Sequence, residues 1–309
     1  FKVTPVLGKK IMTTINDSTV VTSTALFSLA ILNSDGFSIS KRELVSRIEL
    51  LKSLLEEDKY STKTLICEKT GEEIIDQMRN LGFLSKEDIN DRISLTNLEA
   101  AKLSFYRNNI SHLLIFESLI CGFFQYQKEI IKEDLLQSIK MIYPFLKEEF
   151  FLKWDEADLD QLINLKLNKL INKNLILEDS NVYKRPDFKS KEFYETQSLG
   201  RLVQPSIDRF YVLISQLWKN SEEHISKNEL ERNSLEILKN LEKTQARLTP
   251  EFSEKWMFDV FLSRLIENKY VREDDKGMLY PTRITQRLEK DANKFLEPNW
   301  LKELSKSTT

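Results

Sequence analysis

One arrangement of apolar and polar positions recurs three times along the chain. The copies are ISKREL at residues 39–44, IIKEDL at 130–135 and ISKNEL at 225–230. In the first and third copies, Ser40 and Ser226 stand three residues before Glu43 and Glu229. This is the spacing of a capping box, in which a serine hydroxyl and a glutamate close a helix N-terminus together. The middle copy has Ile131 instead of serine and loses that cap. The pattern predicts three related helices.

A second shared pattern follows each of these helices. A helical stretch stops at Gly82, Asn174 or Lys269, and then come an apolar pair, a polar turn and a short apolar return. Such a sequence predicts a β-hairpin. The apolar pairs, read as first strands, are Phe83-Leu84, Leu175-Ile176 and Tyr270-Val271, and the returns are ISL at 93–95, VY at 182–183 and MLY at 278–280.

Another apolar helix is predicted before each cap, near residues 22–32, 108–127 and 199–219. Helix, capped helix, helix and hairpin is the order of a winged-helix module. The predicted fold is therefore mainly α, with three tandem winged-helix-like helical modules and short β-hairpins. We expect a linker at 1–21, modules at 22–97 and 98–190, and a third module with a C-terminal tail at 191–309.

Winged helices often bind DNA through their third helix, so those helices should carry base-reading and phosphate-binding side chains. They do not. The first, GEEIIDQMRNL, is acidic, the second opens with DEADLD before Lys166 and Lys169, and the third has few cations. Over the whole chain, 46 Lys and Arg nearly balance 48 Asp and Glu, so no overall field attracts nucleic acid. We expect no nucleic-acid partner and interpret the modules as packing units.

Residues for the commoner catalytic devices are also absent from the sequence. Its seven glycines form neither G-x-G-x-x-G nor a phosphate-binding P-loop, and its two histidines and two scattered cysteines make no zinc motif. We therefore expect no metal and no cofactor. Two cysteines are too few for a disulfide framework, and Cys121 in its apolar run predicts a buried, inert thiol in a reducing compartment.

The stretch FYRNNISHLLIFESLICGFF at 105–124 invites a catalytic interpretation, because His112 and Glu117 imitate a His-x-x-x-x-Asp spacing. On a continuous helix, however, five residues turn about 500°, so the two side chains would point about 140° apart. We predict instead a buried helix over 108–124, with His112, Phe116 and Ile120 in the core. Its apolar run of about 15 residues is shorter than the roughly 20 that span a bilayer.

The same stretch offers two small polar features. Ser111, Ser118, Gly122 and Gln125 fall on one narrow stripe that permits close approach of a neighbouring helix. At the mouth of the predicted helix, Tyr106, Arg107, Asn108 and Asn109 are candidate domain-docking residues, because guanidinium and amide groups donate several hydrogen bonds. Simple capping of this helix by Asn108 or Asn109 is an equal alternative.

Several passages resemble one protein family in their residues, their order and their spacing. They are IMTTINDSTVVTSTALFSLAIL at 11–32, FYRNNISHLLIFESLI at 105–120, YPFLKEEFFLKWDEADL at 143–159 and LTPEFSEKWMFDVFLSRLIENKYV at 248–271. The chain resembles, over nearly its whole length, the C-terminal region of bacterial membrane-associated glycerol-3-phosphate 1-O-acyltransferase. That enzyme transfers an acyl group from acyl-carrier protein or acyl-CoA to the 1-hydroxyl of glycerol 3-phosphate, which begins phospholipid synthesis.

The resemblance also implies what this chain lacks. The family's catalytic histidine lies in a His-x-x-x-x-Asp motif, whereas His112 and His224 are each followed at that spacing by a glutamate. We therefore expect no catalytic residue in this chain, an N-terminal catalytic domain before Phe1 as its partner, and residues 1–21 as the linker to that domain. The resemblance implies a parent enzyme peripheral to the membrane on the cytoplasmic face of the bacterial inner membrane, and the chain alone should be soluble in the cytoplasm. The alternative is a stand-alone winged-helix-like protein-interaction scaffold, with a DNA-binding form of it as third.

Overall fold

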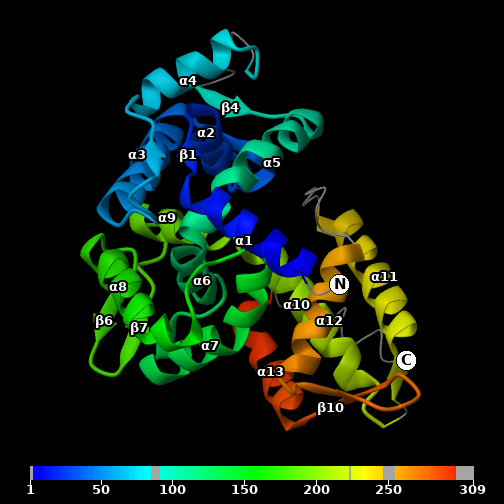
Figure 1. The fold of residues 1–309 in the computed structure, drawn as a ribbon. Coiled ribbons are helices and arrows are strands. Elements are labelled where there is room, and N and C mark those ends of the chain that lie inside the picture. The colour runs from blue at the N-terminus through cyan, green and yellow to red at the C-terminus, as the bar shows by residue number, and fades with distance from the viewer. Residues whose placement is uncertain (1–2, 85–90, 223, 246–254, 297–309) are drawn as a thin grey trace.

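The structure is a computed structural model that describes residues 3–84, 91–222, 224–245 and 255–296. Helices dominate and the strands are short, as predicted for a mainly α fold. Figure 1 shows three groups of helices, with the first at the top, the second at the lower left and the third at the lower right. The polar turn predicted between Leu84 and the return at 93–95 falls largely in residues outside this description. Residues 297–309, at the end of the third predicted module, lie wholly outside it.

The first group begins with an almost completely buried helix and a capped one. Its elements are α2 (Ser23–Leu32), η1 (Asp35–Phe37), β2 (Ser38–Ser40), α3 (Lys41–Glu57), α4 (Gly71–Asn80) and β4 (Arg92–Ser94). The hydroxyl of Ser40 accepts from the amide of Glu43, whose carboxylate accepts from the amide of Ser40, so the predicted capping box is confirmed. Strand β2 leads into this cap and pairs antiparallel with β4.

The second and third groups repeat this order and complete it with a third strand. The second contains α6 (Ile115–Phe123), β5 (Glu129–Ile131), α7 (Lys132–Glu149), η3 (Glu156–Asp158), α8 (Leu159–Asn172), β6 (Leu177–Asp179) and β7 (Val182–Lys184). The third contains α10 (Gln204–Lys219), β8 (Ile225–Ser226), α11 (Lys227–Gln245), α12 (Lys255–Glu267), β9 (Val271–Glu273) and β10 (Met278–Pro281). The strand orders β5-β7-β6 and β8-β10-β9 are equivalent, so the repeat seen in the sequence is a repeat of topology.

The three predicted helix stops share one backbone conformation. Gly82, Asn174 and Lys269 have φ of 77°, 56° and 60°, the left-handed region that ends a helix. In each copy the next amide reaches back five residues, from Phe83 to Met78 with N···O 3.0 Å in the first. This is a Schellman motif, and it explains two errors. The strands predicted at Phe83-Leu84 and Leu175-Ile176 are wrong because these residues close the turn. Phe83 and Leu84 form no strand, and β6 begins only at Leu177.

A further helix ends each group by packing on the group's own first helix. Helix α5 (Asn97–Ser111) lies on α2, α9 (Lys191–Gly200) on α6, and α13 (Arg283–Phe295) on α10. Helices α6 and α9 approach closely at Gly200, where an added Cβ would lie 3.0 Å from the backbone of Cys121. A Cβ added at Gly122 would lie 3.9 Å from the carbonyl oxygen of Gly200. The predicted stripe of small residues on α6 therefore does receive a neighbouring helix. The division at 97/98 and 190/191, and the likeness to winged helices, stay predictions.

The helix predicted over 108–124 is not continuous. Helix α5 ends at Ser111, one 3-10 turn follows as η2 (His112–Leu114), and α6 starts at Ile115. The prediction of a single helix is wrong because two groups meet here, and α5 closes the first while α6 opens the second.

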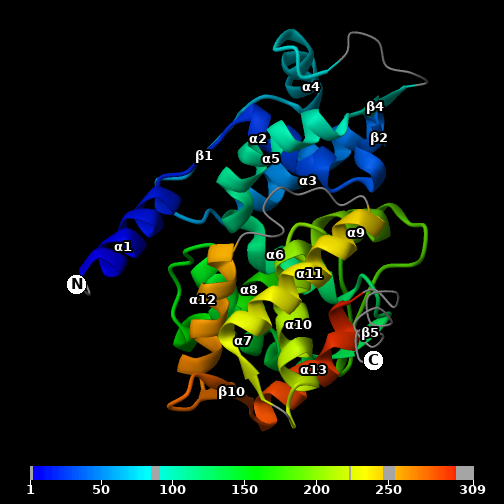
Figure 2. The same ribbon diagram turned by 90° about the vertical axis from the view of Figure 1, so that its right-hand side faces the viewer.

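The segment predicted as a linker contains α1 (Val3–Asp17) and β1 (Val20–Val21), which pairs in parallel with β3 (Leu65–Ile66). Figure 2 shows α1 standing out from the side of the body.

Candidate functional site

The predicted docking residues lie in the second half of α5. Tyr106 is partly exposed, and its ring forms a T-shaped pair with the Phe83 ring at 5.9 Å between centroids. The guanidinium of Arg107 donates to the side-chain oxygen of Asn108 at 3.1 and 3.0 Å. Asn108 and Asn109 are exposed and stand inside the helix, which begins after a capping box at Thr96. The capping alternative for the asparagines is therefore excluded, and docking by these four residues stays a prediction.

His112 is buried and takes part in a contact with the N-terminal segment. Its Nε2 lies 3.2 Å from the hydroxyl of Thr19 and 3.4 Å from the carbonyl oxygen of Asn16, and its ring packs edge-on to Tyr60 at 5.1 Å. Burial lowers the pKa of His112 to about 4, which the nearby carbonyl of Asn16 and carboxylate of Asp17 only partly offset. The imidazole is thus neutral at physiological pH.

Phe116 and Ile120 are also buried. The Phe116 ring stacks on Tyr143 at 5.4 Å and meets Trp154 edge-on at 5.5 Å. These aromatic contacts join α6, α7 and the segment after α7 in one core.

Glu117 does not orient His112, because it faces a pair of lysines on α8. The glutamate is almost completely buried, and one of its carboxylate oxygens lies 3.1 Å from Nζ of Lys166 and in direct contact with Nζ of Lys169. Lys166 also pairs with Asp58, and Lys169 donates to the carbonyl of Leu54 at 3.0 Å, both at the end of α3. This ion cluster joins the first and second groups.

The pKa of each charged group in the ion cluster depends on its burial and on the opposite charges beside it. Burial alone would raise the pKa of Glu117, but the two ammonium groups outweigh it and hold that pKa below its usual value. Burial opposes the charge of Lys166, yet the carboxylates of Glu117 and Asp58 raise its pKa. Burial lowers the pKa of Lys169, against the attraction of Glu117. Glu117, Lys166 and Lys169 were all named in the sequence analysis, but nothing in the sequence indicated that these three side chains meet.

The C-terminal end of α1 and the residues after it are held by three polar contacts. The side-chain amide of Asn16 donates to the carbonyl of Phe150 at 2.8 Å, the carboxylate of Asp17 lies 3.2 Å from Nζ of Lys153, and Thr19 meets His112. We call Asn16, Asp17, Thr19, His112 and Lys153 the clamp. Lys153 Nζ also lies 4.3 Å from the centroid of the Tyr60 ring and donates to the Tyr60 carbonyl. The clamp fixes α1 to the first and second groups together.

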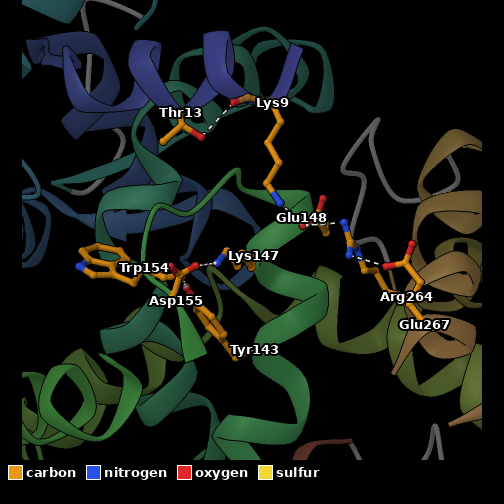
Figure 3. Close-up of polar contacts among 9 residues, drawn as sticks. All are labelled: Lys9, Thr13, Tyr143, Lys147, Glu148, Trp154, Asp155, Arg264 and Glu267. Atoms are coloured by element: carbon orange, nitrogen blue, oxygen red, sulfur yellow. Dashed lines mark hydrogen bonds and ion pairs between the residues drawn. The ribbon is translucent and has the colours of Figure 1, made fainter. Parts of the chain in front are cut away.

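A second contact holds the outer half of α1. Glu148, near the end of α7, accepts an ion pair from Lys9 on α1 and another from Arg264 on α12, at 2.9 Å. Figure 3 shows Glu148 between these two cations, with Arg264 also reaching Glu267. One carboxylate therefore links α1 to the second and third groups. Sequence reasoning missed both contacts because it treated residues 1–21 as a linker.

The described residues offer little for chemistry of other kinds. No group of His, Cys, Asp and Glu among them could hold a metal ion. None of the helices in the described ranges is both long and apolar enough to cross a membrane. Cys121 is buried, and burial raises the pKa of its thiol, so it is an inert protonated group. Cys67 is half-buried, with its sulfur 3.1 Å from the hydroxyl of Ser23.

An open hollow of about 1000 Å³ lies beside β9 and β10. Its lining mixes cations such as Arg272 and Arg283 with carboxylates such as Asp274. That carboxylate already accepts from the Tyr280 hydroxyl at 2.8 Å and from the Met278 amide at 2.9 Å. The hollow favours no single class of ligand.

Comparison with known proteins gives a consistent result. The model of the glycerol-3-phosphate acyltransferase C-terminal region matches residues 2–274. The chain is 27% identical over 294 residues to a glycerol-3-phosphate acyltransferase of Ectopseudomonas mendocina (strain ymp), covering 94% of this chain and 36% of the relative. Corresponding enzymes of Pseudomonas fluorescens (strain Pf0-1) and Pseudomonas putida (strain W619) are 26% and 27% identical, covering 94% and 88% of this chain and 35% and 33% of the relatives. The chain thus spans about a third of the length of these curated relatives.

Proposed function

Because the chain belongs to the family of glycerol-3-phosphate acyltransferase C-terminal regions, we propose that it is the non-catalytic part of such an enzyme and holds an N-terminal catalytic domain in its working position. The parent reaction would transfer an acyl group from acyl-carrier protein or acyl-CoA to glycerol 3-phosphate. The parent would be peripheral to the membrane, on the cytoplasmic face of the bacterial inner membrane. No specific contact among the described residues favours the stand-alone scaffold.

The clamp is the observation that carries this proposal. A flexible linker would let a preceding domain move independently, whereas residues 16–19 are buried or half-buried apart from Ser18 and are fixed by hydrogen bonds and an ion pair to two groups of helices. Together with the ion pair from Lys9 to Glu148, the clamp leaves α1 with one orientation. A domain attached through α1 would therefore receive a defined position. Tyr106, Arg107, Asn108 and Asn109 on α5 are a second proposed docking surface for the same domain.

The proposal is tested by the rate of acyl transfer from palmitoyl-CoA to glycerol 3-phosphate. The 309-residue chain alone should show none, because none of its side chains is assigned to the reaction. In the full-length enzyme, Asn16→Ala should lower the rate by about ten-fold or more, since a misplacement of about 1 Å can cost on the order of 100-fold. The matched control is Thr14→Ala, on the same helix but exposed, with its hydroxyl donating to the carbonyl of Lys10 within the helix.

Both variants should be assayed at a temperature where circular dichroism shows them folded. Equal rates for Asn16→Ala and Thr14→Ala would remove the support for the proposal. So would turnover by the chain alone that His112→Ala abolishes.

A further inference from the structure

Helix α1 has its polarity inverted with respect to the body of the protein. The side that faces the body carries Lys9, Thr13 and Asn16, which are spaced by four and three residues and are the helix's more buried side chains among residues 6–16. Leu7, Ile11 and Ile15 form the opposite stripe at a spacing of four, and are 54%, 49% and 55% exposed. We call these three residues the outer stripe.

A surface helix normally turns its apolar stripe to the core and its polar side to water. The clamp and the ion pair to Glu148 prevent α1 from rolling into that arrangement, because both hold its polar side against the body. The outer stripe is therefore kept in solvent by specific contacts. Contiguous apolar surface of this kind marks an interaction site more often than a chance exposure.

The partner that covers the outer stripe can be inferred from the size of the stripe, the charge of α1 and the position of α1 in the polypeptide. A free-standing protein interface uses roughly 20–30 residues a side, many more than the outer stripe provides, which argues against a second copy of this chain. An interfacial lipid-binding helix carries several cations on its polar face. Among residues 6–16 of α1 the only cations are Lys9, which is engaged by Glu148, and Lys10. A covalently attached partner needs much less surface, because tethering gives an effective concentration in the millimolar range.

We propose that the outer stripe is the surface on which the preceding catalytic portion of the same polypeptide docks. This inference rests on the proposed function, since the matched relatives extend well beyond the third of their length that this chain covers. Helix α1 lies within the matched C-terminal region and is its first element. Docking there would cover Leu7, Ile11 and Ile15 while the clamp keeps the opposite side of the helix in place.

Cysteine labelling tests the proposal without an activity assay. Ile11→Cys and, as matched control, Val20→Cys are each placed in a Cys67→Ser background, since Val20 is 53% exposed on β1 and outside the stripe. Maleimide modification of each site is followed by peptide mass spectrometry, in the 309-residue chain and in the full-length enzyme. We expect residue 11 to react at least ten-fold more slowly in the full-length enzyme than in the isolated chain, and residue 20 to react equally in both.

Equal rates for residue 11 in the two proteins would overturn the proposal. Protection of residue 11 in the isolated chain that grows with protein concentration would assign the stripe to a second copy, and protection that requires vesicles of phosphatidylglycerol would assign it to a lipid surface. Either result also overturns it. Protection in the full-length enzyme together with normal activity of Asn16→Ala would uphold the docking and reject the supporting role.

Discussion

Acidification should destabilise the protein through His112 in a way that can be calculated from its environment. The ordinary pKa of 6.5 falls to about 4 in the folded chain, because the imidazole is buried among Thr19, Tyr60 and the Asn16 carbonyl. The unfolded chain therefore takes up a proton first as the pH falls. The stabilising contribution is fully present above pH 6.5 and is lost progressively between pH 6.5 and 4.

The size of this loss follows from the shift. At 1.36 kcal/mol per pKa unit, the neutral histidine contributes about 3 kcal/mol, and the slope cannot exceed about 1.4 kcal/mol per pH unit. Urea denaturation of the wild type and of His112→Gln, measured at half-unit steps from pH 7.5 to 4, gives the difference in unfolding free energy at each pH. Carboxylates titrate in both proteins, so they cancel in that difference.

The wild-type advantage should shrink by about 3 kcal/mol across this range. A difference that stays constant with pH would show that His112 titrates as an ordinary exposed histidine, and the assigned burial in the clamp would be wrong. The same experiment bears on α1, since His112 contacts both Thr19 and the carbonyl of Asn16 in the clamp.

Other predictions concern the core, the ion cluster and the repeated caps. Phe116→Ala should cost about 3–5 kcal/mol in urea denaturation through lost burial and a cavity beside Tyr143, and a loss below about 1 kcal/mol would contradict its place in the core. Glu117→Ala should cost about 3–5 kcal/mol by removing the buried carboxylate that Lys166 and Lys169 share, and an unchanged denaturation midpoint would argue against the cluster. Ser40→Ala should lower stability by about 0.5–2 kcal/mol by removing a cap. Ile131→Ser should raise stability by up to about 1 kcal/mol, because this residue is exposed and already has an N-cap backbone of φ −64° and ψ 136°; no gain would mean that its side chain stabilises the fold elsewhere.

Features set by neighbouring residues could be predicted from the sequence. The capping box at Ser40 and the helix stops at Gly82, Asn174 and Lys269 depend on side chains and backbone within a few residues. The return strands were also identified, because polar turns separate them from the preceding helices. The mainly α fold followed from these local signals.

Features set by distant residues could not be predicted in the same way. Glu117 and Lys166 are 49 positions apart, and only the packing of α6 on α8 brings them together. The break between α5 and α6 at His112–Leu114 contains no proline or glycine that would indicate it in the sequence. It forms because two groups of helices meet there. The orientation of α1 could not be predicted, because residues 1–21 were expected to be a linker and the partners of Lys9 and Asn16 lie 139 and 134 positions away. The docking role of Tyr106 and its neighbours remains a prediction.

The three Schellman turns are equivalent, so comparing the residues that occupy them indicates a stabilising substitution. Glycine adopts the left-handed conformation of such a turn without strain, whereas a residue with a Cβ is disfavoured there by roughly 1–2 kcal/mol, and asparagine by less than most. The left-handed position is occupied by Gly82 in the first copy, Asn174 in the second and Lys269 in the third. The conformation therefore costs least free energy in the first copy and most in the third. We therefore expect Lys269→Gly to stabilise the third turn, because Gly82 occupies the equivalent position in the first.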